Sequence, residues 1–300
     1  MKNQELKKFS SQADELFRKK NLHPEQHDEK SKIVRLFHDT FLKTVWWNHC
    51  YYGGGFEVLE TLNNLHKDEF CFDKSSNWRR RVSDFIPALN NNKAWLNSLQ
   101  SLVSCTMKGV GVGEMFMTLV DPDAQFSHGS DFTSGTDEYE MKKASGGCLK
   151  GNTDAAHRVI DHLRATLGID RKKGESLEKD IYPKLNGLVE NERRRFFTEL
   201  YPNMRTNAIN ALVNLPNLKT ENQRFAHGHI ILKEYKNIDG WDNMALVSDA
   251  KKPVMTHIAD VDDVSFLKNH VAFTPKMWRG KDTNAVGDGY ATIKVIKNKS

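Results

Sequence analysis

The chain has 300 residues, of which 38% are hydrophobic and 28% are charged, with only 8 prolines. These proportions are typical of a folded globular protein and exclude the disordered and fibrous classes. The formal net charge of +5, spread over 44 basic and 39 acidic residues, permits a polyanionic partner without requiring one. A chain of this length can form one large domain or two smaller ones.

The cysteines and the N-terminal segment bear on the cellular compartment. Four cysteines lie far apart with no CxxC pair, so we expect neither a zinc ribbon nor a dense disulfide framework, and a reducing compartment fits best. The start, MKNQELKKF, lacks the apolar core of a signal peptide. No later segment approaches the ~18 uninterrupted apolar residues of a membrane span. We therefore expect a cytoplasmic protein without a membrane partner.

Helical periodicity dominates the first part of the chain. Apolar residues recur at helical spacing over 4–20 and 25–49, and a run of three glycines at 53–55 then breaks the pattern. Residues 56–65 and 76–105 again have helical spacing, the latter with an interruption near Pro87. We predict that residues 1–107 form a mainly helical region.

The pattern changes after residue 107. Glycines at 109, 111 and 113 lead into an apolar run at 115–120, followed by a polar loop of small residues. Asp131 and Phe132 begin a short segment, Gly135 supplies a turn, and 139–144 is predicted as the partner strand. The sequence therefore predicts a charged β-hairpin at this point.

The remaining elements complete the predicted layout. Helices are expected over 152–167 and 184–200, and strands over 229–235, 244–247, 271–274 and 290–296. We predict an α/β fold in which residues 108–300 form a core with a small mixed sheet flanked by helices, extended by a strand-rich C-terminal part.

The predicted hairpin concentrates chemistry-bearing side chains. Side chains alternate between the faces of a strand, so Glu140 and Lys142 share one face and Met141 points the opposite way. If Asp131 begins the adjacent strand, its carboxylate meets that of Glu140, and two like charges held so close favour a bridging divalent cation. Oxygen ligands suit Mg²⁺, and Lys142 beside the ion can position an attacking water. The alternative is that these charges decorate an ordinary exposed strand.

This set of residues resembles the motif of the PD-(D/E)XK nuclease superfamily, over residues 109 to about 165. The resemblance matches Asp131 to the first acid, although Ser130 stands where the motif has proline. It matches Glu140 to the second acid and Lys142 to the lysine. It also makes Glu114 the helix-borne acid and the Met141 backbone carbonyl a further metal ligand.

The resemblance implies a restriction-endonuclease-like core and a Mg²⁺-dependent endonuclease that hydrolyses DNA phosphodiester bonds. Mn²⁺ is an expected substitute, RNA is an alternative substrate, and an oligomer is compatible with the sequence. One rival is a non-enzymatic DNA-binding protein, or a bacteriophage virion or assembly protein, that retains this fold; its location would then be the virion. Another is a restriction-type enzyme whose helical N-terminal region recognises a DNA sequence.

Other candidate residues have simpler interpretations. His227 and His229 are expected on one strand face as hydrogen-bonded or surface histidines rather than metal ligands. The acids at 260, 262 and 263 are expected at a helix start. The aromatic pairs at 46–47 and 51–52 are expected to pack in the helical core rather than stack on bases. Basic runs such as 79–81 are equally compatible with a solvated surface and with phosphate contacts.

Overall fold

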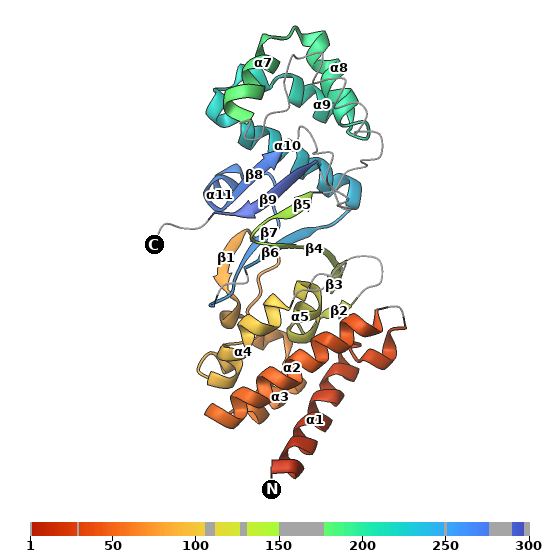
Figure 1. Ribbon diagram of the computed structural model, residues 1–300, viewed down its shortest axis with the longest axis vertical. Helices are drawn as coiled ribbons and strands as arrows, with labels where there is room; N and C mark the ends of the chain where they lie inside the picture. Colours follow the sequence, from red (N-terminus) through yellow and green to blue (C-terminus); the bar gives the residue numbers. More distant parts are fainter. Residues whose placement is uncertain are drawn as a thin grey trace. The chain divides into compact units, whose positions relative to one another are not determined.

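The computed structural model describes residues 2–28, 30–105, 112–126, 131–149, 177–248, 251–275 and 290–296. The chain forms two compact units (Figure 1). Unit 1 comprises Met1–Ala144 and Trp241–Asp260, and unit 2 comprises Ser145–Gly240 and Val261–Ser300. The α/β class is confirmed, but the expected boundary near residue 107 lies inside unit 1. The reason is that the N-terminal helices and the following sheet share one apolar core.

The helices of unit 1 follow the predicted periodicity closely. Phe9, Leu16 and Phe17 of the first helix pack in the same buried core as Phe37 and Phe41 of the second. The α-helices are α1 (Lys2–Lys19), α2 (Ser31–Tyr52), α3 (Gly55–Asn64), α4 (Lys93–Ser104) and α5 (Val112–Val120). Short 3-10 turns occupy Pro24–Gln26, Lys67–Glu69, Val82–Phe85 and Pro87–Leu89. The first three predicted helices are thereby confirmed.

The predicted helix over 76–105 is wrong in its first part. Trp78–Arg81 forms a strand, β1, and a helix begins only at Lys93, where the Asn92 side chain accepts a hydrogen bond from the Trp95 N–H at 3.0 Å. Trp78 is buried and stacks on the ring of His257 with centroids 4.9 Å apart. Tertiary packing of this one aromatic residue therefore overrides the helical spacing around it.

A mixed six-stranded sheet forms the rest of unit 1, with the order β1-β7-β6-β4-β3-β2. Its further strands are β2 (Ala124–Phe126), β3 (Phe132–Ser134), β4 (Asp137–Lys143), β6 (Asn243–Val247) and β7 (Val254–Ile258). β4 and β6 are parallel, and the other neighbours are antiparallel. Figure 1 shows the helices of unit 1 gathered beside this sheet, with α5 next to β2.

The predicted hairpin is confirmed as β3 and β4. Phe132 lies opposite Tyr139 and Ser134 opposite Asp137, and Gly135 makes the turn with a positive φ of 64°. This register places Asp131, the residue just before β3, opposite Glu140. Opposed residues in an antiparallel pair point to the same face, so the two carboxylates are directed to one side of the sheet.

Unit 2 combines helices with a second, antiparallel sheet of order β5-β9-β8. Its strands are β5 (Gly147–Leu149), β8 (Val271–Pro275) and β9 (Ala291–Val295). Its helices are α7 (Tyr182–Gly187), α8 (Glu190–Leu200), α9 (Thr206–Val213), α10 (Thr220–Asp239) and α11 (Val264–His270), with a π-helical turn at Leu177–Ile181 and a 3-10 turn at Leu215–Asn217.

The predicted strands over 244–247, 271–274 and 290–296 are confirmed, whereas the predicted helix over 184–200 is interrupted at Leu188. The predicted helix over 152–167 lies outside the described residues. Within the residues that the structure describes, no helix combines the length and the apolar character that crossing a bilayer requires.

The predicted strand over 229–235 is wrong, because these residues lie inside α10. Ile230, Ile231 and Leu232 give the segment its strand-like composition. In the helix, Ile231 and Leu232 are buried together with Gln223 and His227, whose spacing is helical. The helix begins well before this apolar run and ends at Gly240, which has a left-handed φ of 74°.

The close contact between α10 and β8 gives a first prediction. A Cβ added at Gly228 would lie 2.1 Å from the Cβ of Phe273, so Gly228→Ala forces the helix and the strand apart. We expect it to lower the free energy of unfolding by about 2 kcal/mol or more. Gly187→Ala is the control, since nothing lies within 4 Å of an added Cβ there. Urea unfolding measures both, and equal midpoints for the two variants would contradict this packing.

Candidate active site

The structure brings the four predicted site residues together within unit 1. Glu114 lies in the first turn of α5, Asp131 directly precedes β3, and Glu140 and Lys142 lie in β4. Lys142 Nζ forms an ion pair with Glu140 Oε1, as expected for two residues that share one face of a strand. A helix start and a β-hairpin thus supply the residues of one polar cluster.

Asp131 is held in place by two neighbours. Its Oδ2 accepts a hydrogen bond from the backbone N–H of Met141 at 2.6 Å. Its carboxyl group also makes a hydrogen bond with that of Glu114, in which one of the two groups carries the proton. Asp131 therefore links the helix-borne acid to strand β4. The Met141 N–H thus contacts the cluster, and the Met141 carbonyl expected from the resemblance as a metal ligand stays a prediction.

Burial distinguishes the cluster from the charged face of an ordinary surface strand. Glu114 is 5% exposed and Glu140 8% exposed, and the Lys142 side chain is only 12% exposed. Carboxylates almost never lie so deep in a protein unless they are paired or bind a metal. The interpretation of β4 as an exposed, decorated strand is therefore wrong for Glu140 and Lys142.

The electrostatics of Asp131 reflect this burial. Loss of solvent raises the pKa of its carboxyl group to about 6, and the nearby charge of Glu140 acts in the same direction. The hydrogen bond from Met141 and the positive charge of Lys142 oppose the shift. Asp131 therefore holds its proton to a higher pH than an exposed aspartate does, and a cation placed between the two carboxylates would relieve their repulsion.

The donor set fits a hard divalent cation in its chemistry, since Glu114, Asp131 and Glu140 all offer carboxylate oxygens. The ligand atoms of these three acids lie farther apart than those of a second group of potential ligands. Of the described residues, Asp14, His23 and His38 form the group of three whose ligand atoms all lie within 4.8 Å of one another. The carboxylate cluster thus has suitable ligands in a looser arrangement.

The two histidines that the sequence singled out are hydrogen-bonded, as predicted, but on a helix rather than a strand. His227 is fully buried in unit 2 between the hydroxyls of Tyr182 and Tyr201, at 3.1 Å and 2.8 Å. Burial lowers the pKa of His227 to about 3, so the ring stays neutral. His229 Nε2 lies 2.6 Å from the carbonyl oxygen of Val261.

The acidic run before α11 is a helix start, as expected. Asp263 is the N-cap residue, and its Oδ1 accepts a hydrogen bond from the Phe266 N–H at 2.9 Å. Asp262 forms an ion pair with Lys233 at 2.5 Å. These contacts account for both carboxylates within unit 2 without a catalytic role.

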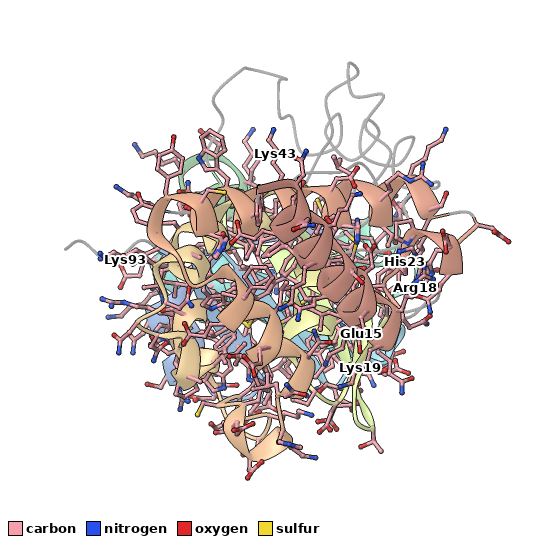
Figure 2. All side chains as sticks on the ribbon, turned by 90° about the horizontal axis from the view of Figure 1, so that it is seen from below. Glu15, Arg18, Lys19, His23, Lys43 and Lys93 are labelled. Atoms are coloured by element: carbon pink, nitrogen blue, oxygen red, sulfur yellow. The ribbon has the colours of Figure 1, made fainter. Side chains whose placement is uncertain are left out.

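The expectation that the aromatic pairs pack in the helical core is wrong for three of the four residues. Trp47, Tyr51 and Tyr52 are 61%, 66% and 55% exposed, whereas Trp46 packs against the core and contacts Phe9. Lys43, Trp47 and Tyr51 recur every four residues on the solvent side of α2, and Figure 2 shows Lys43 pointing away from the helices. The four-residue spacing from Lys43 to Trp47 and Tyr51 could have predicted that these aromatic residues are exposed, whereas their apolar composition suggested a core.

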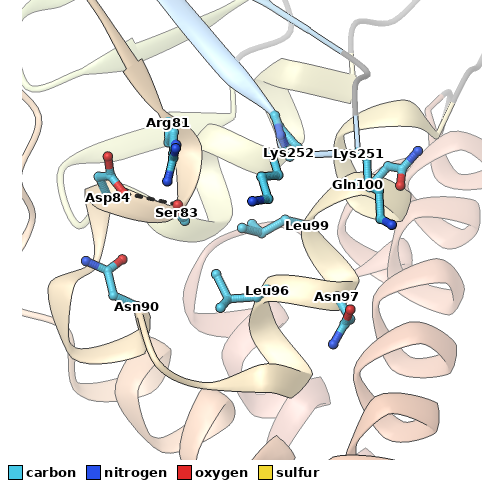
Figure 3. A pocket seen from close by; sticks show the side chains of 11 residues that line it. Arg81, Ser83, Asp84, Asn90, Leu96, Asn97, Leu99, Gln100, Lys251 and Lys252 are labelled. Carbon is cyan, nitrogen blue, oxygen red and sulfur yellow. Dashed lines mark hydrogen bonds between the residues drawn. The ribbon is translucent and has the colours of Figure 1, made fainter.

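Sequence reasoning also missed a basic pocket in unit 1. Its volume is about 460 Å³, and Arg81, Lys251 and Lys252 lie around it (Figure 3). Leu96 and Leu99 of α4 form its apolar side. Among the described residues of its lining, the only acid is Asp84, which accepts a hydrogen bond from the Ser83 hydroxyl at 3.1 Å. The pocket therefore has an excess of positive charge.

Strand register relates this pocket to the carboxylate cluster. Lys143, at the end of β4, pairs with Val247, which pairs with Met255, which in turn pairs with Arg80. The end of β4 and the end of β1 therefore lie at the same end of the sheet. Three strand spacings separate them by roughly 14 Å, which is about four base pairs of B-form DNA.

The raised pKa of Asp131 gives a second prediction. Because the folded-state pKa exceeds the unfolded value of 3.8, Asp131 costs stability that grows as the pH rises from about 4 to 6 and is constant above. Asn keeps an oxygen for the Met141 N–H without the charge. Asp131→Asn should therefore raise the free energy of unfolding at pH 8 by about 1–3 kcal/mol, and the gain should vanish near pH 4.

Urea unfolding at pH 4, 6 and 8 measures this difference. Glu138→Gln, on an exposed residue of the same strand, is the control and should change stability little at any pH. Equal stabilities of Asp131→Asn and wild type at pH 8 would show that the carboxylate is not held at a cost.

No family model, no curated protein and no solved structure matches this chain. The fold class is therefore known from the chain's own architecture, as a mixed α/β arrangement with a helical N-terminal part. The function must be inferred from the carboxylate cluster and the surfaces around it.

Proposed function

We propose that this protein is a metal-dependent nuclease that hydrolyses DNA phosphodiester bonds, with a restriction-endonuclease-like core of the PD-(D/E)XK type. The observation that carries the proposal is the convergence of Glu114, Asp131, Glu140 and Lys142 in a buried polar cluster. Such a cluster is costly to a fold that does not use it, since two carboxylates repel each other and lose solvent.

The topology of unit 1 supports this assignment. Helix α5 leads into three antiparallel strands, β2, β3 and β4, and β6 later adds to β4 in parallel. This is a mixed sheet with a helix beside it, as the resemblance implies. Glu114 comes from the helix start, Asp131 from the residue before β3, and Glu140 from β4, and the proposal assigns them the roles of the motif's acids.

Each residue has a defined role in the proposed reaction. Asp131 and Glu140 would hold Mg²⁺, with Glu114 as a further acid, and the ion would supply a water of lowered pKa and positive charge opposite the phosphate. Lys142, next to Glu140, orients the attacking water. The water oxygen forms the new bond to phosphorus and releases a proton to solvent, while the bond from phosphorus to the sugar oxygen breaks and the sugar oxygen takes up a proton from solvent. The Met141 N–H fixes the Asp131 carboxylate throughout.

The basic pocket supplies a second part of the proposal, namely contact with the DNA backbone. Arg81, Lys251 and Lys252 place positive charge at the end of the sheet where β4 ends. Lys and Arg side chains that neutralise phosphates provide much of the affinity for DNA, independently of sequence. A duplex with its scissile phosphate at Lys142 would pass within reach of this pocket.

The cleavage activity is testable with plasmid DNA and Mg²⁺ or Mn²⁺. We expect wild type to cleave and Asp131→Ala, Glu140→Gln and Lys142→Ala each to lose about 100-fold or more in rate. Lys143→Ala is the matched control, since Lys143 lies on the opposite face of β4, and it should retain activity within about tenfold. Identical products and rates from wild type, Asp131→Ala and Lys142→Ala would refute the nuclease assignment.

Binding to the basic pocket is tested separately from cleavage, by fluorescence anisotropy of labelled duplex DNA in chelator over a range of salt concentrations. Arg81→Gln and Lys252→Gln should each weaken binding and reduce the slope of log affinity against log salt by about 1. Arg195→Gln removes a cation in unit 2 that is paired with Glu199 and serves as the control. An equal loss in Arg195→Gln would show that the pocket is not the contact surface.

The exposed aromatic surface of Trp47, Tyr51 and Tyr52 favours a second candidate function, a binding or assembly protein that retains the fold. Large exposed aromatic groups are enriched where proteins bind partners. DNA binding without metal-dependent cleavage by the wild-type protein would favour this alternative.

A further inference from the structure

Three side chains of ligand type, none of them a member of the carboxylate cluster, converge in the N-terminal part of unit 1. Asp14 comes from α1, His23 from the segment after α1, and His38 from α2. One ligand atom of each lies within 4.8 Å of those of the other two. Three separate segments of the chain therefore present imidazole and carboxylate groups to one point.

Burial and solvent access are divided among these residues in a way that suits a bound ion. The side chains of His23 and His38 are each only 10% exposed, and that of Asp14 is 42% exposed. The two imidazoles thus lie on the buried side of the cluster, and the carboxylate lies on its solvent-exposed side. A water molecule can reach the cluster from the Asp14 side.

Further carboxylates lie behind the two imidazoles. His38 Nε2 is 2.8 Å from Asp14 Oδ1, and His38 Nδ1 is 3.5 Å from Asp39 Oδ1. His23 Nδ1 is 3.7 Å from Glu25 Oε2. A carboxylate beside the second ring nitrogen orients a metal-bound histidine and increases its basicity. His38 has such a neighbour in Asp39, whereas His23 Nδ1 accepts a hydrogen bond from the Glu25 N–H at 3.4 Å.

The charges around the cluster favour a divalent cation. Asp14, Asp39 and Glu25 contribute three negative charges. Arg18, which pairs with Glu25 at 2.9 Å, and Arg35, which also acts on Glu25, contribute two positive charges, so the acids remain in excess by one. Figure 2 shows Arg18 close to His23. A simple ion pair between Asp14 and His38 explains two of the three residues. His23 in turn caps the 3-10 turn Pro24–Gln26, and its ring lies edge-on to that of His38 with centroids 5.6 Å apart. These contacts bring a second imidazole to the same point.

We propose that Asp14, His23 and His38 bind a divalent transition-metal ion, Zn²⁺, with water as a further ligand. Two imidazoles and one carboxylate form a common zinc ligand set, whereas Mg²⁺ prefers oxygen ligands alone. The ion would tie α1 to α2 and so stabilise the helical part of unit 1. This site is separate in ligands and in chemistry from the cluster of Glu114, Asp131 and Glu140.

The test measures Zn²⁺ binding to the full chain by equilibrium dialysis, after removal of bound metals with a chelator and in excess Mg²⁺ to occupy oxygen-only sites. Wild type should bind one Zn²⁺ per chain at this site, and its thermal midpoint should rise by on the order of 5 °C with saturating Zn²⁺. Asp14→Asn and His23→Gln should each weaken binding at least tenfold and abolish the shift.

Two matched controls separate ligation from general effects. Asp28→Asn alters an exposed carboxylate near the cluster, and His66→Gln alters an exposed histidine that, like His23, precedes a 3-10 turn. Both should bind Zn²⁺ as wild type does. The proposal is overturned if wild type binds no Zn²⁺, if Asp14→Asn binds it unchanged, or if Asp131→Asn rather than Asp14→Asn abolishes binding. Asp14 is half-exposed, so that variant decides the outcome even if His23→Gln does not fold.

Discussion

Two carboxylates held side by side, Asp131 and Glu140, impose the main constraint on unit 1. Their repulsion and loss of solvent must be offset by the rest of the hairpin. The rings of Phe132 and Tyr139, opposite each other in the next pair of residues, stack with centroids 4.6 Å apart and are fully buried. The Met141 N–H and the Lys142 ammonium compensate part of the charge. Apolar stacking one residue away thus keeps an unfavourable polar arrangement in place.

Local sequence patterns predicted that Asp131, Glu140 and Lys142 lie together. The position of Glu114 and the basic pocket depend on contacts between segments that are far apart in the sequence. Strand parity alone places Glu140 beside Lys142, and Gly135 marks the turn that aligns Asp131. Glu114 was identified only by resemblance, because nothing in its local sequence shows that the start of α5 lies against the hairpin. The basic pocket escaped prediction because Arg81 and Lys252 become neighbours only when β1 pairs with β7. No periodicity within either segment encodes that pairing.

The errors elsewhere share one physical origin, since the environment overrode intrinsic preference. Residues 229–235 have the β-branched composition of a strand but belong to a helix that starts nine residues earlier, at Thr220. The residues around Trp78 have helical spacing in the sequence, but Trp78 stacks on His257 and its segment forms a strand. Trp47 and Tyr51 are apolar enough for a core but lie on the solvent side of α2. In each case the missing information was which surface the segment faces.

The division of the chain into interleaved units has a consequence for its synthesis. Ser76 and His257, which are linked through the Ser76 carbonyl, are separated by 181 residues. During translation β1 is therefore synthesised long before its partner β7, and β4 before its partner β6. Until then β1 and one edge of β4 are unpaired. Such long-range pairings slow folding and leave strand edges open to misassembly. β5 likewise waits for β9, so neither unit is encoded by one contiguous stretch of the gene. A fragment that ends after β4 would carry the proposed nuclease residues on an unfinished sheet.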